Sequence, residues 1–508
     1  MAKQVVQIGR NCWYEGPVQR VGLLVDGDDY YRALYDAGQH AERYLLLAGW
    51  QFDTDACLLR GEEAAAAPLP VTLLEYLDAL CKRKPLLRVY LLAWDFHAVF
   101  ALEREWMQDL RFKWLANERV QFLFDDQHVP GGSHHQKFVV MDGALAFLGG
   151  LDVCDHRWDD RHHKVPNPLR VSRGAPHRPF HDVQAYLVGT EVAGKLAELF
   201  SARWLAAGGE PLRLPRVLGA FDDYVPAGAV PLSAERVALS RVDPKGAPDA
   251  HADCREIFHL TVDAIGASRS LIYIETQYFS SKEVADALVT RLRSASRTRL
   301  EVVLVLNEHA ETFKEEVAVG LAQANVIRQL REAVEGTPHR LGIYYSVPQT
   351  EVESDGHATY IHSKLLIVDD RFMTVGSANL TNRSTCLDTE LNLAVETVDP
   401  SDPLCRSIAA ARRSLIAEHL GVDDLREGDS LVQALDEHAR NGVGRLRLHP
   451  SPTTSELTIL AVVDPTQLPF DPAAPESRTH DGALFASGIG TLWSRIFSGR
   501  DAGTPTRA

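Results

Sequence analysis

Two apolar runs in the chain share one pattern. Residues 43–52 (RYLLLAGWQF) and 270–279 (SLIYIETQYF) are rich in hydrophobic side chains, and both end in Gln followed by an aromatic residue. Short apolar runs of this kind are typical of buried strands. We therefore predict one strand in each half of the chain, with Gln51 and Gln277 at equivalent positions.

The same order of further elements follows each of these strands. A helical pattern leads to a strand, more helix, a short strand and a last strand. These predicted segments, apart from the second helix, cover residues 70–81, 87–93, 120–124 and 137–141 in the first half and 282–294, 300–306, 341–345 and 364–368 in the second. Strands alternating with helices indicate α/β layers with a largely parallel or mixed sheet.

This repetition predicts two similar lobes. Residues 205–230 are rich in Gly and Pro and lack periodicity, which is typical of a connection. The predicted division is a first catalytic lobe at 1–205, an inter-lobe linker at 206–235, a second catalytic lobe at 236–420 and a C-terminal extension of unassigned role at 421–508.

Composition excludes some classes of function. The balance of 45% hydrophobic and 24% charged residues is that of a soluble globular protein. A net charge of −16 disfavours nucleic acid as a partner, because binding without sequence preference relies on clustered Lys and Arg. A local basic pocket for one phosphate group is still compatible with this charge.

The cysteines and the N-terminal residues indicate a compartment. The seven cysteines include no Cys-x-x-Cys pair, which favours reduced thiols. No apolar segment of a signal peptide follows Lys3, and no apolar run reaches spanning length. We expect a cytoplasmic or peripherally membrane-associated protein, although export without a cleavable signal leaves no trace in a sequence.

One motif occurs twice at identical spacing. It consists of His, one residue, Lys, four residues, Asp, six residues, and then Gly-Gly or Gly-Ser. Its members are His135, Lys137 and Asp142 in the first half and His362, Lys364 and Asp369 in the second. The period of a strand places His and Lys of each motif on the same face, so both can reach one ligand. We expect both motif strands to face one shared cleft.

These residue types suit phosphodiester chemistry. One imidazole can act as a nucleophile and the other as an acid, while Lys137 and Lys364 stabilise charge on the phosphoryl oxygens. Asp142 and Asp369 lie at strand ends, where a carboxylate is expected to brace the loop rather than to react.

Several further side chains are candidates for binding or orienting. Asn379 in the Gly-Ser-x-Asn turn is a predicted neutral donor, and Asp152 holds the corresponding place in the first half. A nucleophilic histidine needs an acceptor at its other ring nitrogen. By position, Asp182 follows His135 and Glu390 follows His362, which pairs each carboxylate with the histidine of its own half. Gln277 completes the predicted set.

The loop from Cys154 to His163 is rich in Asp and His and could be interpreted as a metal site. It has no regular ligand spacing, and such loops are more often solvated or facing substrate. We therefore predict no metal site.

Blocks of the chain resemble the phospholipase D superfamily, and specifically its eukaryotic-type, phosphatidylcholine-cleaving branch. The resemblance rests on HHQKFVVMD, GGLDVCDHRWDD, PFHDV, IYIETQYF, IHSKLLIVDDRFMTVGSANLTNRS and DTELNLAV, in that order, over roughly residues 48–395. It implies a bilobal α/β fold with two β-sheet lobes related by a pseudo-twofold axis, a phosphohistidine intermediate, and no metal or other cofactor. It also implies His135 as nucleophile and His362 as acid and base. Thr276 departs from the Asn that is common in the branch.

The expected function is cleavage of a glycerophospholipid at a membrane surface, with water or an alcohol as the acceptor. A nuclease of the same fold, a cardiolipin-type phosphatidyltransferase and a catalytically silent scaffold are the alternatives. The intact motifs count against the scaffold, and the net charge counts against the nuclease.

Overall fold

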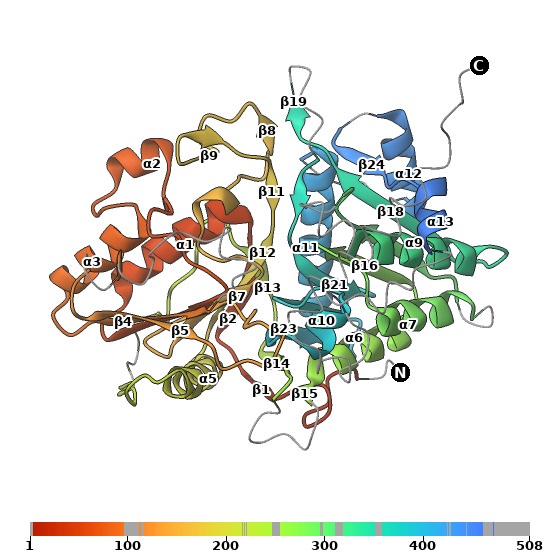
Figure 1. Cartoon of the computed structure of the whole chain (residues 1–508). Coiled ribbons are helices and arrows are strands. Elements are labelled where there is room, and N and C mark those ends of the chain that lie inside the picture. The colour runs from red at the N-terminus through yellow and green to blue at the C-terminus, as the bar shows by residue number, and fades with distance from the viewer. Residues whose placement is uncertain are drawn as a thin grey trace, which may run out of the picture.

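The chain folds into two lobes that lie side by side (Figure 1). A computed structural model describes residues 4–95, 111–112, 116–215, 217, 219, 221–245, 254–294, 298–309, 319–350, 358–423, 425, 428–442, 444–460 and 471. Of the predicted C-terminal extension, residues 461–470 and 472–508 lie outside the described residues. Within the described part, no helix is long and apolar enough to cross a membrane.

A mixed sheet of eight strands forms the core of the first lobe. In spatial order its strands are β13 (Val230–Leu232), β2 (Arg20–Val25), β12 (Val183–Val188), β7 (Leu145–Gly149), β6 (Phe138–Met141), β3 (Tyr44–Gly49), β4 (Arg88–Trp94) and β5 (Val120–Asp125). Strands β3, β4 and β5 are parallel, whereas the other neighbours are antiparallel.

The second lobe contains a ten-stranded sheet with the same central order. Its strands are β1 (Tyr14–Pro17), β14 (Arg236–Asp243), β23 (Glu390–Glu396), β22 (Phe372–Gly376), β21 (Lys364–Val368), β16 (Leu271–Thr276), β17 (Glu301–Val305), β18 (Arg340–Ser346) and β24 (Leu446–Leu448), with β15 (Cys254–Arg255) beside β14. The path from β14 to β18 repeats the path from β2 to β5 strand for strand, with the same pairing directions. The predicted duplicated α/β fold is therefore confirmed.

Some strands lie away from their neighbours in sequence. Near the N-terminus, β1 pairs with β14 of the second sheet, and β13, from the stretch predicted as linker, pairs with β2 of the first. In the region after residue 420, β24 pairs with β18. Each of these short strands extends the edge of a sheet.

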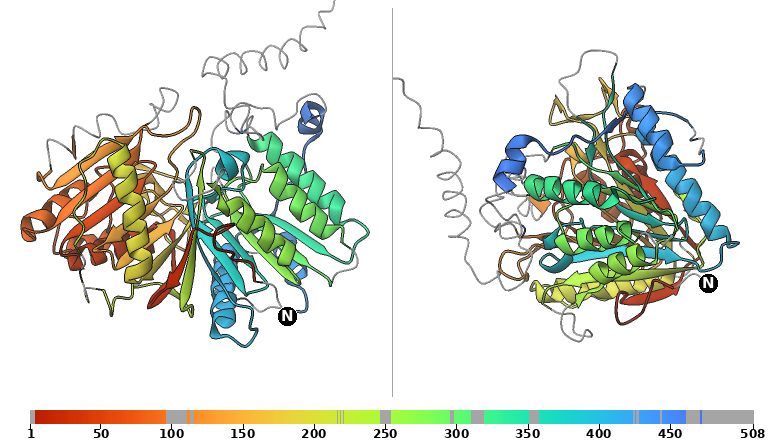
Figure 2. Two further views of the ribbon diagram at one scale, coloured as in Figure 1. Left: turned by 90° about the horizontal axis from the view of Figure 1, so that it is seen from below. Right: turned by 90° about the vertical axis from the view of Figure 1, so that its right-hand side faces the viewer.

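Helices pack on both faces of each sheet. The first lobe carries α1 (Asp26–His40), α2 (Gly61–Ala66), α3 (Leu73–Arg83) and α5 (Thr190–Ala206). The second carries α6 (Glu256–Ala267), α7 (Lys282–Leu292), α9 (Leu321–Val334), α10 (Asn382–Cys386), α11 (Pro403–Leu420), α12 (Leu431–Asn441) and α13 (Thr454–Leu460). In Figure 2, the green helices α6, α7 and α9 lie side by side over the second sheet.

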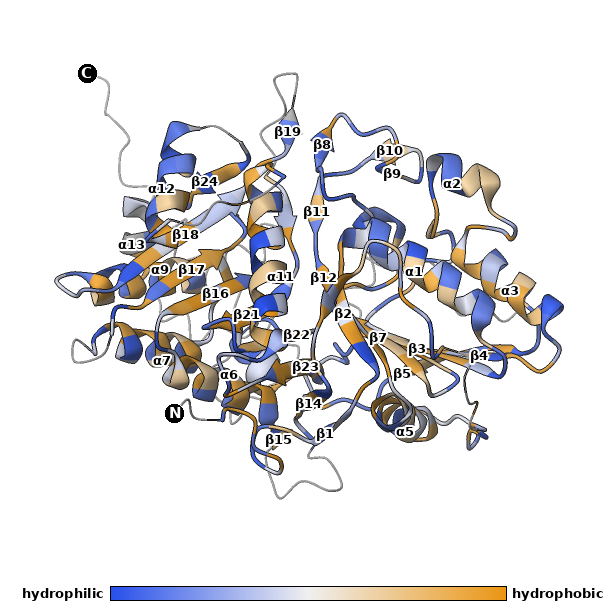
Figure 3. Cartoon of the chain, turned by 180° about the vertical axis from the view of Figure 1, so that it is seen from behind, coloured by the Kyte–Doolittle hydropathy of each residue, from blue (hydrophilic) through white to orange (hydrophobic). Residues whose placement is uncertain are grey.

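One continuous hydrophobic cluster joins the two lobes. It includes Leu46 and Phe138 of the first sheet, Ile367 and Val375 of the second, and apolar side chains of α5 and α11. Strands such as β16 and β17 are hydrophobic over most of their length because both of their faces are covered (Figure 3). The shared core places the two motif strands at one interface between the lobes.

That interface also contains short parallel ladders between the lobes. Strand β11 (Phe180–His181) of the first lobe pairs with β20 (Tyr360–Ile361) of the second, and β8 (Lys164–Val165) pairs with β19 (Gln349–Thr350). A further hairpin, β9 (Val171–Ser172) with β10 (Ala175–Pro176), lies between β8 and β11 in the sequence. The β11–β20 ladder leads directly to the second motif.

Candidate active site

The motif histidines and lysines precede or begin equivalent strands. Lys137 comes immediately before β6, and Lys364 is the first residue of β21. Both lysines are almost fully buried, and each donates a hydrogen bond to the carbonyl of its own motif histidine. Each His–Lys pair therefore lies at the end of its sheet where the motif strand begins.

The motif aspartates lie at the opposite ends of these strands. The Asp142 carboxylate accepts hydrogen bonds from the amides of residues 42–44, at 2.6, 2.9 and 2.8 Å. Asp369 accepts equivalent bonds from residues 269–271, at 2.8, 2.8 and 2.9 Å. Four residues lie between each lysine and its aspartate, which is five steps along the strand, or about 16 Å. These contacts anchor the start of β3 and β16, and they suit a supporting role.

The carboxylates that hold the two histidines cross between the lobes. His135 Nδ1 lies 3.0 and 3.1 Å from the Glu390 carboxylate oxygens, at the start of β23 in the second lobe. His362 Nδ1 lies 2.6 Å from Asp182 Oδ2, between β11 and β12 of the first lobe. The pairing of each carboxylate with the histidine of its own half, expected by position, is therefore wrong.

Backbone contacts across the interface explain this crossing. The His135 amide donates to the Thr389 carbonyl at 3.0 Å, and the His362 amide donates to the His181 carbonyl at 2.8 Å. Each motif segment is thus bound to the opposite lobe, and the residue that follows its partner carbonyl carries the carboxylate. The contact from the first lobe to the second is thus repeated from the second lobe to the first, as a pseudo-twofold relation between the lobes requires.

The turns after β7 and β22 differ between the lobes for a steric reason. Ser377 Oγ donates to Glu390 Oε2 at 2.5 Å and so helps to hold the partner of His135. Its counterpart is Gly150, where an added Cβ would lie 2.5 Å from Asp182 Oδ1. The Gly-Gly and Gly-Ser versions of the motif therefore fit two carboxylates that approach differently.

The two lysines have different polar neighbours. Lys137 Nζ lies 3.2 Å from Asp152 Oδ2, which is also 3.3 Å from Arg157 Nη1. Lys364 Nζ donates to Gln277 Oε1 at 3.1 Å. Asn379 is buried, and its Oδ1 accepts no hydrogen bond from the described residues. Arg157 adds a third cation that motif spacing does not reveal, because it belongs to the Asp- and His-rich loop.

Charged groups of each motif affect the pKa of the histidine in the other motif. Burial, together with Lys137 and Lys364, holds the pKa of His135 well below its usual range. Burial does the same to the pKa of His362, with Lys364, Arg157, Lys137 and His135 adding to the effect. Groups of each motif therefore act on the histidine of the other.

Burial also shifts the pKa values of the two carboxyl groups and of Lys364, in each case towards the uncharged form. Burial raises the pKa of Glu390 to about 8, with a further contribution from Asp388, and raises the pKa of Asp182 to about 7. Burial also lowers the pKa of Lys364 to about 7. Burial disfavours the charged form of each of these groups. A bound anion would bring the negative charge that stabilises the protonated lysine and imidazole groups.

The Asp- and His-rich loop is not solvated throughout. Asp159 and His163 are completely buried, whereas His162 is exposed. The expectation of a solvated loop is therefore wrong for these two residues, because charged partners from both lobes surround them.

Comparisons with known proteins agree with this geometry. Residues 261–411 match the family model described as "Cardiolipin synthase, PLD-like domain". The chain is 24% identical to phospholipase D alpha 1 of Zea mays over 78% of its length, and 24% identical to phospholipase D alpha 2 of Arabidopsis thaliana over 79%. It spans 65% of the length of each of these relatives.

Similarity to a solved structure concerns the fold. The phosphatidylserine synthase of Haemophilus influenzae Rd KW20 superimposes with a TM-score of 0.54 over 84% of this chain and 95% of its own, at 17% identity. In its two sheets of the same strand order, its repeated His-Lys-Asp motif and these similarities of sequence, the chain resembles members of the phospholipase D superfamily.

Proposed function

We propose that the protein is a phospholipase D-type phosphodiesterase that cleaves glycerophospholipids through a phosphohistidine on His135. The observation that carries this proposal is the pair of imidazoles, His362 buried and His135 half-buried, each oriented by a carboxylate of the opposite lobe, with two buried lysines beside them. Such a set contains a nucleophile, an acid and the cations that a phosphodiester requires.

In the first step, His135 Nε2 attacks phosphorus while its Nδ1–H donates to Glu390. Lys137 and Lys364 stabilise the negative charge that develops on the non-bridging oxygens. His362 donates its Nε2 proton to the oxygen of the departing head group. An N–P bond forms as the P–O bond breaks, and the head-group alcohol leaves.

In the second step, His362 accepts a proton from water or an alcohol, whose oxygen attacks phosphorus and breaks the N–P bond. Water yields phosphatidic acid, and an alcohol yields a new phosphatidyl ester. The assignment of His135 as nucleophile follows the resemblance of its sequence block to the phosphatidylcholine-cleaving branch.

The choice of a lipid substrate rests on charge and on the relatives. A net charge of −16 disfavours a nucleic-acid duplex or strand as substrate. The relatives are phospholipases D by name, while the matching family model and the solved structure carry the names of phosphatidyltransferases. These two activities differ in the acceptor of the second step.

One assay distinguishes the alternatives. The purified protein is incubated with a mixed phospholipid extract and a primary alcohol, with EDTA present, and the lipid products are identified by mass. We expect phosphatidic acid and the phosphatidyl alcohol, because the lysines supply the charge that a metal ion would otherwise provide. Transfer only to a lipid or amino-acid alcohol would favour a phosphatidyltransferase, and the absence of any cleaved lipid would contradict the proposal.

The rate should depend on pH through the two His–carboxyl pairs. His135 attacks only while Glu390 is ionised, because a protonated Glu390 would donate to Nδ1 and leave the ring proton on Nε2. With the pKa of Glu390 raised to about 8, this pair becomes competent as the pH rises. The Asp182–His362 pair must keep its proton for the leaving group, and with the pKa of Asp182 at about 7 it loses that proton as the pH rises.

We therefore expect a bell-shaped profile of kcat/KM with its maximum at about pH 7.5, midway between two coupled titrations. The measurement is kcat/KM for a soluble phosphodiester in buffers of constant ionic strength. A profile that stays flat between about pH 6 and 9 would show that neither pair controls the rate.

A further inference from the structure

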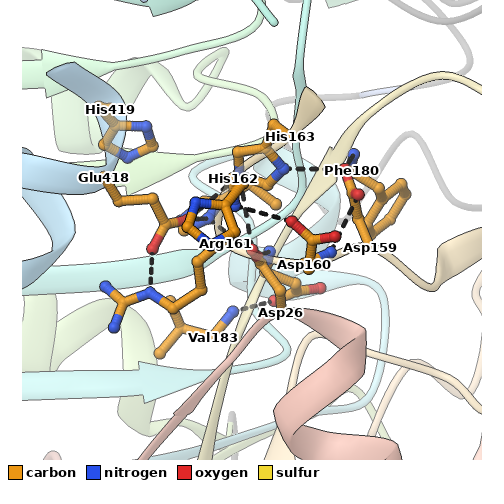
Figure 4. Close-up of polar contacts among 12 residues, drawn as sticks. Asp26, Asp159, Asp160, Arg161, His162, His163, Phe180, Val183, Glu418 and His419 are labelled. Carbon is orange, nitrogen blue, oxygen red and sulfur yellow. Dashed lines mark hydrogen bonds and ion pairs between the residues drawn. The ribbon is translucent and has the colours of Figure 1, made fainter. Parts of the chain in front are cut away.

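A cluster of buried charged side chains lies at the lobe interface beside the second motif (Figure 4). It is centred on His181, which is completely buried and directly precedes Asp182. We propose that His181, held as an imidazolium by carboxylates of both lobes, is a positioning residue that sets where Asp182 holds His362. This inference rests on the proposed function and extends it to a residue outside the reacting groups.

Every polar atom of the His181 ring faces a carboxylate. Nδ1 lies 2.7 Å from Glu418 Oε1 on α11 and 3.0 Å from Asp26 Oδ1 at the start of α1. Nε2 lies 2.9 Å from Glu275 Oε2 on β16. Where these carboxyl groups are ionised, both ring nitrogens donate, and only the charged imidazolium can do so. Burial opposes this charge, but the three carboxylates raise the pKa of His181 well above its usual range.

The surrounding charges balance. Glu418 also contacts His163 Nε2 at 3.2 Å and Arg161 Nε at 2.5 Å. His163 Nδ1 lies 2.8 Å from Asp159, which accepts a further bond from Arg170. Four carboxylates thus face two imidazoles and two guanidinium groups; these residues are Asp26, Asp159, Glu275, Glu418, His163, His181, Arg161 and Arg170.

His163 and His419 complete the surroundings of His181. Burial lowers the pKa of His163, but Asp26 and Asp159 outweigh it and raise this pKa to about 9. His419 Nε2 lies 3.2 Å from Glu275 Oε1, and burial lowers the pKa of this imidazole. These charged groups balance when His163 and His181 are charged, His419 is not, and all four carboxyl groups are ionised; burial and the Glu418 charge raise the pKa of Asp26 to about 7. A neutral, mutually paired set is the form in which buried charges are tolerated.

The cluster is connected to the catalytic histidine through the backbone on either side of Asp182. The His181 carbonyl accepts the His362 amide at 2.8 Å. Asp26 accepts the Asp182 amide on its Oδ1 at 3.1 Å, and the Asp26 amide donates to the Asp182 carbonyl at 2.8 Å. Asp26 adopts a left-handed backbone conformation, with φ of 65°, which these contacts sustain.

Removing the imidazolium would take its charged partner from Glu275 and would leave His163 as the only imidazolium between Asp26 and Glu418 among the described residues. Repulsion among these carboxylates would separate the lobes at β11 and β20, and this movement would displace Asp182 from His362 Nδ1. His135 and Glu390 lie on the other motif and keep their own contacts. The loss should therefore fall on proton transfer by His362 and leave nucleophilic attack by His135 almost intact.

The test compares His181→Gln with wild type on two substrates. For a phospholipid, whose leaving group needs a proton, we expect kcat to fall about 10- to 100-fold with little change in KM. For a phosphodiester with an acidic leaving group, formation of the His135 adduct should fall much less. A crystal structure of the variant should show the Asp182–His362 contact lengthened beyond hydrogen-bonding distance.

Two further variants keep the test decisive. Glu275→Gln removes the charge of the carboxylate that faces Nε2 of the same ring, and it should reproduce the pattern. It replaces His181→Gln as the test if that variant does not fold. His339→Gln alters a buried histidine that lies near Leu300 and Ser294, and it should leave both rates unchanged.

Several results would overturn the proposal. One is an equal loss on both substrates, and another is an unchanged Asp182–His362 contact in the variant structure. A stoichiometric divalent metal in the purified protein, bound by Asp26, His163, His181 and Glu418, would also do so, because a metal requires an unprotonated Nδ1 on His181. If the wild type cleaves no phosphodiester, the proposed function fails, and the variant structure alone decides the positioning role.

Discussion

His135→Ala and His362→Ala should both lose at least about 10⁴-fold in kcat on phospholipids, but they should fail at different steps. The His135 variant lacks the nucleophile, so no covalent intermediate can form on any substrate. The His362 variant keeps the nucleophile and lacks the proton donor. An activated phosphodiester, whose leaving group needs no proton, should still phosphorylate His135 in that variant and then stall.

The measurement is the mass of the intact protein after brief exposure to the activated phosphodiester. We expect an adduct on the His362 variant and none on the His135 variant. Wild type serves as the control, because it should turn over without accumulating the adduct. The reverse pattern would exchange the roles of nucleophile and acid, and would leave the resemblance to the phospholipase D superfamily untouched.

The crossed carboxylates predict a second pair of large effects. Glu390→Gln should behave like loss of His135 function, and Asp182→Asn like loss of His362 function, each with a fall of about 10²- to 10⁴-fold in kcat. The neutral amide no longer supports the charge that develops on the ring, and it can hold the wrong tautomer. Adduct formation from the activated substrate should therefore fail in Glu390→Gln and persist in Asp182→Asn.

Double variants provide the matched control for this prediction. Asp182→Asn added to His362→Ala should cost little more than His362→Ala alone, because Asp182 acts through that imidazole. Glu390→Gln added to His362→Ala should abolish the remaining adduct formation. If Asp182→Asn abolished the adduct and Glu390→Gln did not, the carboxylates would act within their own halves, and the crossed arrangement would have no functional meaning.

Local patterns in the sequence were sufficient to predict the elements of the fold. The apolar runs at 43–52 and 270–279 contain β3 and β16, and the predicted helices at 70–81 and 282–294 correspond to α3 and α7. Hydrophobic periodicity and strand length are properties of neighbouring residues, so they are visible without a structure. The repeat then predicted two equivalent lobes, and the two sheets share one strand order.

Contacts between distant residues were decided by the tertiary structure. His362 and Asp182 are 180 residues apart, and His135 and Glu390 are 255 apart. No periodic signal connects such positions, and the apparent symmetry of the two halves suggested the wrong partners. The pairing depends on the β11–β20 ladder and its counterpart at Thr389, which exist only when the lobes are packed together.

The same distinction applies to the charged residues. The types and spacing of His135, Lys137, His362 and Lys364 in the sequence indicated the chemistry, because a strand places such neighbours on one face. Whether Asp159, His163 and His181 face solvent or one another depends on Glu275 and Glu418, which come from a strand and a helix of the other lobe. Burial is a property of the assembled lobes, so the pKa of each of these groups, and with it the charge that it carries, follows from the tertiary structure.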